Sequence, residues 1–368
     1  MKNYLNFESE IKTLEVELDK LKDPYNQEGL SEVDTQNISK LQNEIDIKLK
    51  DIYANLDPWQ TTLVARHEDR PKAKHFIDNL FDDFISLSGD RFYGEDQSVI
   101  CGFAKFEKKS VLVIGQEKGE NLETRIERNF GMMRPEGYRK TIRLMRLANK
   151  FKIPVISFID TPGAYPGVGA EERGQAEAIA RSIECCMELT VPTISIIIGE
   201  GGSGGAIALA SSNKVLMLEN AIYSVISPEG CATILWRDPK KTLEASKAMK
   251  LSSKDLYDLK IIDEIILEPL GGAHRDKDLI LDNVRSSIKK NLDFFSNMDE
   301  EEIILQRKNK FLSIGRYQGF TTSSNLSDNL SMKTNIIDKF VNKLSYFKKY
   351  LIYFSVFLIL VIIFFATL

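Results

Sequence analysis

The stretch IIIGEGGSGGAIALA, residues 196–210, carries an apolar run into five glycines within seven residues and then into a second apolar run. This order predicts a strand, a tight turn and a helix, because glycine lets the backbone turn sharply and leaves its amides uncovered. The first N–H groups of such a helix lack internal partners and lie at the positive end of its dipole. The stretch therefore predicts a binding site for a negative group, either a phosphate or an oxyanion that develops during a reaction.

A second segment, FIDTPGAYPGVGAEERGQAEAIA at 158–180, repeats this order. Its prolines stiffen the turn, and Gly163 allows a ligand to approach the backbone closely. Glu171 and Glu172 stand in the first turn of the expected helix, where acidic side chains favour the helix dipole; we prefer this interpretation to a role in acid–base catalysis. Two such units in series predict neighbouring oxyanion- or carbonyl-binding edges within one cleft.

The middle of the chain alternates short apolar runs with glycine-rich turns and amphipathic stretches. This alternation predicts an α/β domain with largely buried strands. Hydrophobic residues make up 43% and charged residues 28% of the 368 residues, a globular composition that excludes wholesale disorder. We expect strands at 111–116, 155–160, 193–199 and 214–219, and helices at 136–150, 170–189 and 205–210.

Charge and cysteine content exclude further classes of protein. The formal net charge of −4 argues against a strongly basic nucleic-acid-binding protein. The four cysteines form no CxxC or Cys/His cluster, which argues against a disulfide scaffold or a zinc ribbon in this chain and fits a reducing compartment. A multi-histidine metal site would need all three histidines, so no metal site is expected here.

A basic stretch lies at 129–150. Arg139, Arg143, Arg146 and Lys150 share one face of the expected helix, and Arg134 precedes it. A solvated surface accounts for such a face, and so does contact with the phosphates of a coenzyme or with an acidic partner. The residues alone leave both interpretations open.

The glycine-rich stretch also supports a different enzyme class. Gly199, Gly201 and Gly204 fit G-x-G-x-x-G, and Glu219 follows at the distance of a ribose-binding acid. This pattern is typical of nicotinamide-dependent oxidoreductases. It counts against this alternative that the motif lies deep in the chain, whereas a dinucleotide fingerprint usually opens its domain.

The two ends of the chain differ from its middle. Residues 1–57 predict an N-terminal helical hairpin, which packs on its own domain or forms an oligomer contact, and residues 58–300 predict the main domain. We expect a polar linker at 301–345 and a transmembrane tail at 346–368, because residues 350–368 are almost wholly apolar and just long enough to span a bilayer. An atypical tail and a helix hidden in an assembly are the alternatives.

Five long strings of the chain are distinctive: RNFGMMRPEGYRKTIRLM, FIDTPGAYPGVGAEERGQAEAIAR, IGEGGSGGAIALA, YSVISPEGCATILW and EPLGGAHR. They resemble a known family, the carboxyltransferase alpha subunits of the multi-subunit acetyl-CoA carboxylase of bacteria and plastids. The resemblance reaches to about residue 317. It implies a crotonase-like fold, a spiral of ββα units, and an α₂β₂ assembly whose beta subunit carries a zinc ribbon.

The resemblance also implies a reaction and a set of site residues. The carboxyl group of carboxybiotin would pass to acetyl-CoA, giving malonyl-CoA, the first committed step of fatty acid synthesis. Backbone N–H groups would stabilise the oxyanion of biotin, so no side-chain nucleophile is needed. The expected donors are Gly204, Gly205 and Ala206, with Gly201, Gly202, Gly163 and Ala164 shaping the biotin-binding cleft and Arg134, Arg139 and Arg143 as contacts of coenzyme A or a partner.

Partners and location follow from the same resemblance. The beta subunit, the biotin carboxyl carrier protein and biotin carboxylase are the expected partners, with biotin held on the carrier. The abundance of Lys, Asn and Ile suggests an A/T-rich genome, so we expect the plastid stroma, tethered to a membrane through residues 350–368, with the bacterial cytoplasm as the alternative. A membrane-anchored scaffold without enzymatic activity is a third interpretation of the chain.

Overall fold

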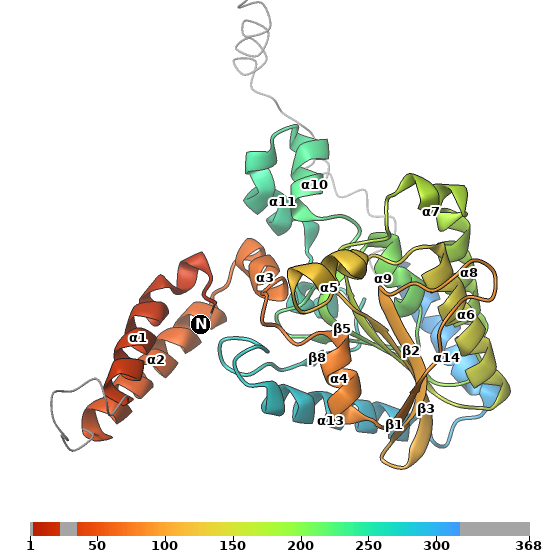
Figure 1. Ribbon diagram of the computed structural model, residues 1–368, viewed down its shortest axis with the longest axis horizontal. Coiled ribbons are helices and arrows are strands. Elements are labelled where there is room, and N and C mark those ends of the chain that lie inside the picture. Colours follow the sequence, from red (N-terminus) through yellow and green to blue (C-terminus); the bar gives the residue numbers. More distant parts are fainter. Residues whose placement is uncertain (1–2, 23–34, 317–368) are drawn as a thin grey trace, which may run out of the picture. The chain divides into compact units, whose positions relative to one another are not determined.

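The computed structural model describes residues 3–22 and 35–316 (Figure 1). By its internal contacts the chain separates into two units, Met1–Ile314 and Gly315–Leu368. The fold given below is that of the first unit. The predicted tail at 346–368 and most of the predicted linker lie outside the described residues. Within the described ranges, no helix is both long and apolar enough to cross a membrane.

One mixed sheet forms the centre of the first unit, with its strands in the order β1-β2-β3-β4-β5-β6-β8 and β7 paired with the end of β5. The pairs from β3 to β8 are parallel, whereas β1, β2 and β3 pair antiparallel. Every residue of β4 and β5 is buried, as expected for parallel strands covered on both faces. The strands are β1 Asp82–Ser86, β2 Val99–Phe106, β3 Lys109–Gln116, β4 Val155–Thr161, β5 Thr193–Gly202, β6 Lys214–Leu218, β7 Ile222–Ser224 and β8 Glu264–Ile266.

Helices cover both faces of this sheet (Figure 1). The α-helices are α1 Ser9–Lys22, α2 Thr35–Ala54, α3 Pro58–Ala65, α4 Ala73–Leu80, α5 Leu122–Glu127, α6 Pro135–Lys150, α7 Val168–Glu172, α8 Gln175–Glu188, α9 Ser203–Ala210, α10 Pro228–Cys231, α11 Thr242–Met249, α12 Ser253–Asp258, α13 Lys277–Phe294 and α14 Glu300–Ser313. Short helical turns are η1 Asn6–Glu8, η2 Asn129–Gly131, η3 Ala232–Trp236 and η4 Pro239–Lys241.

The end of β3 shows which helices lie on which face. A Cβ built on Gly115 would lie 2.8 Å from the Cβ of Ala73 in α4. The next residue, Gln116, donates a hydrogen bond from Nε2 to the carbonyl oxygen of Gly205 in α9, at 2.8 Å. Because successive residues of a strand point to opposite faces, α4 and α9 lie on opposite sides of the sheet.

The predicted strands and helices are largely confirmed, with two corrections. The helix expected over 170–189 is divided into α7 and α8, because Gly174 between them adopts a left-handed conformation with φ of 79°. The strand expected over 193–199 runs on to Gly202, so its last glycines are part of the sheet and the turn comes later.

Helices α1 and α2 pack on each other at the N-terminal end of the unit. Their facing sides bury Ile11, Leu18, Ile45 and Leu49 in a small apolar cluster. Arg275 of the main domain forms ion pairs with two acids of this region, Glu8 at 3.1 Å and Glu15 at 2.5 Å. The N-terminal helices thus contact their own chain, one of the two arrangements that the sequence left open.

The beginning of the predicted linker needs correction, because Glu300–Ser313 forms helix α14. Arg307 of this helix is fully buried and donates hydrogen bonds to the carbonyl oxygens of Cys186, Leu189 and Val191. The buried guanidinium has its donors satisfied by backbone acceptors, which makes α14 part of the main domain. The sequence predicted a solvated linker here because the stretch is rich in charged residues and only two residues of the helix, Ile303 and Arg307, are buried.

Candidate functional site

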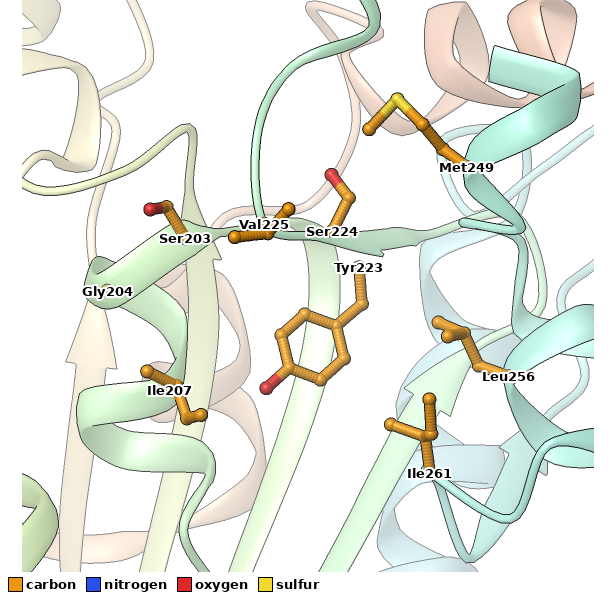
Figure 2. A pocket seen from close by; sticks show the side chains of 9 residues that line it. All are labelled: Ser203, Gly204, Ile207, Tyr223, Ser224, Val225, Met249, Leu256 and Ile261. Atoms are coloured by element: carbon orange, nitrogen blue, oxygen red, sulfur yellow. The ribbon is translucent and has the colours of Figure 1, made fainter. Parts of the chain in front are cut away.

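The candidate site lies where β5 runs into α9 (Figure 2). Gly202 is the N-cap of the helix, and Ser203 follows in a left-handed conformation with φ of 50°. A non-glycine residue in this conformation is strained, and such strain is held in place only where the surrounding structure fixes it. The strained residue marks the sharp turn that the glycine pattern predicted, but at a serine that sequence reasoning did not single out.

The two glycine-rich segments touch each other at this turn. A Cβ on Gly202 would lie 2.1 Å from the carbonyl oxygen of Pro162, and a Cβ on Gly205 would lie 2.6 Å from the carbonyl carbon of Gly163. No side chain fits at either position, so the close approach of two backbones requires glycine there. The structure thus brings Gly163 beside Gly205, as two neighbouring edges of one site would require.

Gly204 is less restricted than Gly201. A Cβ on Gly204 would meet Ile179 at 3.4 Å, an ordinary van der Waals distance, whereas one on Gly201 would lie 2.9 Å from Cδ2 of Tyr223. Gly204 is therefore not required by packing against its neighbours. It is one of the residues that line a cavity, described below.

Helix geometry ranks the predicted N–H donors. Because α9 begins at Ser203, the N–H groups of Ser203, Gly204 and Gly205 have no acceptor within the helix. The N–H of Ala206 is the first that can pair one turn back, with the carbonyl of the N-cap residue. Among the three predicted donors, Gly204 and Gly205 are thus stronger candidates than Ala206.

Two side chains hold the backbone of the touching segments. Gln116 bonds to the carbonyl oxygen of Gly205, as described above. Thr161 at the end of β4 donates from Oγ1 to the carbonyl oxygen of Gly163 at 2.6 Å. Both side chains are fully buried, so they fix the donors before any ligand arrives.

A cavity of about 360 Å³ adjoins the first turn of α9 (Figure 2). Its wall is largely apolar, and no lining residue carries a carboxylate or a cation. Burial raises the pKa of the Tyr223 phenol to about 12, so this wall stays uncharged at neutral pH. The residues that line the cavity are Ser203, Gly204, Ile207, Tyr223, Ser224, Val225, Met249, Leu256 and Ile261.

Residues 201–205 also have the Gly-x-Ser-x-Gly spacing of a nucleophile elbow, which is easily overlooked among so many glycines. The strand, strained serine and helix reproduce the geometry of such an elbow at Ser203. A serine nucleophile needs a neighbouring base, and none of the residues that line this cavity is a histidine, lysine or carboxylate. Hydrolysis through Ser203 is therefore not supported.

The position of the glycines in β5 also argues against a nicotinamide-dependent oxidoreductase. A fingerprint needs its first glycine at the tight turn after the strand. Gly199 and Gly201 instead lie within β5, and a Cβ on Gly199 would lie 2.5 Å from Oδ1 of Asp160. Glu219, the expected ribose-binding acid, accepts a hydrogen bond from the N–H of Glu268 at 3.1 Å.

A cluster of charged side chains lies close to the end of β5, and sequence reasoning did not find it. Lys118 contacts Asp160 at 2.8 Å and Glu200 at 2.6 Å, and Arg66 contacts Glu200 at 2.6 Å. Burial alone would raise the pKa of Glu200, but Lys118 and Arg66 outweigh it and lower the pKa to about 2. The signal available was the Glu117–Lys118–Gly119 sequence directly after a buried strand.

The three predicted arginines are divided between two places. Arg139 and Arg143 line a hollow of about 660 Å³ together with Arg91, Arg146 and Arg181. Arg134 is elsewhere, with its guanidinium 4.7 Å from the centroid of the Tyr165 ring. The basic helix face is thus real for Arg139 and Arg143, and both donate to backbone carbonyls, of Arg173 and Gly89 respectively.

The sequence matches one family model over residues 4–315, that of acetyl co-enzyme A carboxylase carboxyltransferase-like proteins. The chain belongs to this family. Acetyl-coenzyme A carboxylase carboxyl transferase subunit alpha of Pelagibacter ubique is 78% identical over 341 residues, 93% of each chain. The subunit of the same name from Zymomonas mobilis is 51% identical over 315 residues, 86% of this chain and 100% of that one.

Solved structures share the fold. Transcarboxylase 12S superposes with a TM-score of 0.51 at 17% identity, over 63% of this chain and 44% of the other. One chain of a Pseudomonas malonate decarboxylase hetero-tetramer gives a TM-score of 0.52 at 14% identity, over 66% of this chain and 96% of that one. The predicted α/β fold is thereby confirmed, as a fold shared with these two carboxyltransferase and decarboxylase structures.

The relatives correct the expected source. Both named relatives are bacterial, so the predicted plastid location loses its support. The inference from Lys, Asn and Ile content failed because an A/T-rich composition is not confined to plastids.

In the described ranges, no group of three or more His, Cys, Asp or Glu side chains could hold a metal ion.

Proposed function

We propose that this chain is the alpha half of an acetyl-CoA carboxylase carboxyltransferase and moves a carboxyl group from biotin on a carrier protein to acetyl-CoA, forming malonyl-CoA. Family membership supports the activity. The observation that carries the mechanism is the unpaired first turn of α9, which opens beside an apolar cavity of about 360 Å³. We expect the fused ring of biotin to enter this cavity with its carbonyl oxygen at the helix N-terminus.

The protein's part in the reaction is electrostatic. When the carboxyl group leaves the biotin nitrogen, negative charge develops on the ureido oxygen of the ring. The N–H groups of Gly204 and Gly205 stabilise that charge, and the positive end of the helix dipole adds to their effect. Removal of one such donor typically lowers kcat by about 10²–10³. The methyl group of acetyl-CoA then loses its proton to the ring nitrogen, and the enolate takes up the released carbon dioxide.

The uncharged wall serves this chemistry. An oxyanion is stabilised more strongly by fixed dipoles when no water and no mobile charge compete with them. Ile207, Tyr223 and Leu256 contribute to the uncharged lining of the cavity. Gly201, Gly202, Gly163 and Ala164 would shape the cleft that admits the ring.

A beta subunit would complete the site. Apolar side chains that line the cavity are exposed in the single chain, with Val225 79% and Ile207 39% accessible. We expect the beta subunit to cover them and to supply most contacts of acetyl-CoA, with its own zinc ribbon. The biotin carboxyl carrier protein and biotin carboxylase would act in the same complex.

Reconstitution tests the activity. Purified chain is mixed with a beta subunit, biotin and malonyl-CoA, and the reverse reaction is followed as loss of malonyl-CoA. Turnover that requires both chains is expected. Binding of the beta subunit without turnover would instead support the scaffold interpretation and would refute the proposed activity.

The bacterial cytoplasm is the location we propose, with the apolar residues 350–368 as a membrane tether. Lysate is fractionated with the full chain and with a chain lacking residues 346–368. Recovery of only the full chain with the membranes is expected, and an equal distribution of the two would exclude the tether.

A further inference from the structure

A second cavity, of about 340 Å³, lies near the ends of β4 and β5 and differs in charge from the first. It is separate from the cavity beside α9, since the two share no lining residue. Four cationic side chains and one carboxylate line it: Arg66, Lys72, Lys118, Arg125 and Glu200.

Three of these cations already have carboxylate partners. Arg66 contacts Glu200 and Glu229, and Lys118 contacts Glu200 and Asp160. Arg125 has a longer contact with Glu68, at 3.4 Å. The single carboxylate of the cavity wall is therefore already shared between two cations, and it leaves no negative charge for a fourth.

Lys72 is the fourth cation, and it is buried with only 8% of its surface accessible. Its ammonium donates one long hydrogen bond, 3.4 Å, to the carbonyl oxygen of His67. Among the residues that the structure describes, no carboxylate oxygen lies within 4.0 Å of its Nζ. A buried ammonium with so little compensation is costly, and burial lowers the pKa of Lys72 to about 8.

We propose that this cavity binds a small oxyanion, a carboxylate or a phosphate group, with Lys72 as its main charged contact. The cavity is large enough, since one water occupies about 30 Å³ of liquid. Asp160, which pairs with Lys118, acts on the Lys72 ammonium only from beyond ion-pair distance, so an oxyanion in the cavity would give it a counter-charge in direct contact. The cavity wall also includes Pro162, which directly precedes Gly163, so the bound anion would lie close to the proposed transfer site without being part of it.

Calorimetric titration of the full chain, without a beta subunit, tests the proposal independently of carboxyl transfer. Malonate supplies the carboxylate arm and inorganic phosphate the phosphate arm, each at ionic strength matched with sodium chloride. Saturable binding of at least one anion is expected. The anion that binds more tightly shows whether the cavity prefers a carboxylate or a phosphate group.

Variants locate the binding. Lys72→Met keeps the apolar stem and should weaken binding about 10–100-fold, whereas Lys72→Arg should retain it. The matched control is Lys74→Met, an exposed lysine paired with Asp78, which should bind like the original chain. If Lys72→Met does not fold, Arg125→Met replaces it, with weaker binding again expected. Absence of saturable binding in the original chain, or unchanged affinity in the cavity variant, would overturn the proposal.

Discussion

Two regions at the end of β5 differ sharply in charge. On the α9 side, glycines bring two backbones together and leave N–H groups beside an uncharged wall. On the other side, Glu200 and its partners crowd charged side chains into a largely buried cluster. Only two residues separate Glu200 from Ser203 in the sequence, yet one environment lacks charged side chains and the other concentrates them.

This difference suggests a division of labour. Preorganised amides stabilise transient charge best where no permanent charge competes for them. The ion pairs near the end of β5 link three segments of the chain. Lys118, which follows β3, contacts both Asp160 of β4 and Glu200 of β5. We therefore expect changes on the α9 side to affect turnover first, and changes in the charged cluster to affect stability first.

The largest effect is expected from Gly205→Val. Its Cβ would collide with the backbone of Gly163, displacing the donors from the cavity, so turnover in the reverse reaction should fall at least about 10³-fold. Binding of the beta subunit, measured by gel filtration, should be retained. Gly94→Ala is the control, since a Cβ there meets nothing within 4 Å. Near-normal turnover of the Gly205 variant would contradict the assignment of the donors.

Lys118→Met removes the central cation of the charged cluster. It leaves Asp160 and Glu200 buried with one cation fewer, which should destabilise the protein by about 3–5 kcal/mol in urea unfolding. Lys109→Met removes an exposed pair with Asp293 and should cost less than about 1 kcal/mol. Equal effects of the two changes would mean that the cluster contributes no more than a surface ion pair.

Acid should reduce the contribution of the charged cluster to the free energy of unfolding. The pKa of Glu200 is lowered to about 2 in the folded chain, so its stabilising contribution is complete above its unfolded pKa near 4.5 and is lost as pH falls toward 2. That contribution is about 3 kcal/mol by linkage. Glu200→Gln should flatten this part of the unfolding free energy plotted against pH. An unchanged slope in the variant would exclude Glu200 as its source.

The smallest effect concerns Lys72. Its pKa is lowered by burial, so without bound anion its charge destabilises the folded state below about pH 8, and stability should rise as pH increases from about 8 toward its unfolded value. Lys72→Met should raise stability at pH 7 by about 1 kcal/mol or more and remove that rise. A loss of stability in chloride buffer would show that the ammonium has a partner in the folded chain.

The sequence predicted the α9 side well because its signals are local. A strand, a run of glycines and a helix are written consecutively at 193–210, and the turn at Gly163 follows the same order. Ser203 escaped notice because a serine inside a glycine run gives no signal of its own left-handed conformation. The extension of β5 through Gly202 also depends on its pairing with β7, which no local pattern reveals.

The charged side could not be predicted in the same way. Arg66, Lys118, Asp160 and Glu200 come from four separate segments, and only the sheet order brings them together. The buried role of Arg307 is likewise a tertiary effect, since its acceptors lie more than 90 residues away in the chain. A charged residue in a sequence normally indicates solvent, so such buried cations become recognisable only in three dimensions.

The central claim is that backbone N–H groups of α9 stabilise the biotin oxyanion, and replacing an amide by an ester tests it most directly. Substituting glycolic acid for Gly205, and separately for Gly204, removes one N–H and keeps the shape of the backbone. A matched ester at Ala208, further along the same helix, removes an N–H that helix geometry pairs internally. We predict that kcat of the reverse reaction falls about 10²–10³-fold for at least one glycine ester and far less for the control. Equal rates for all three esters would contradict the mechanism.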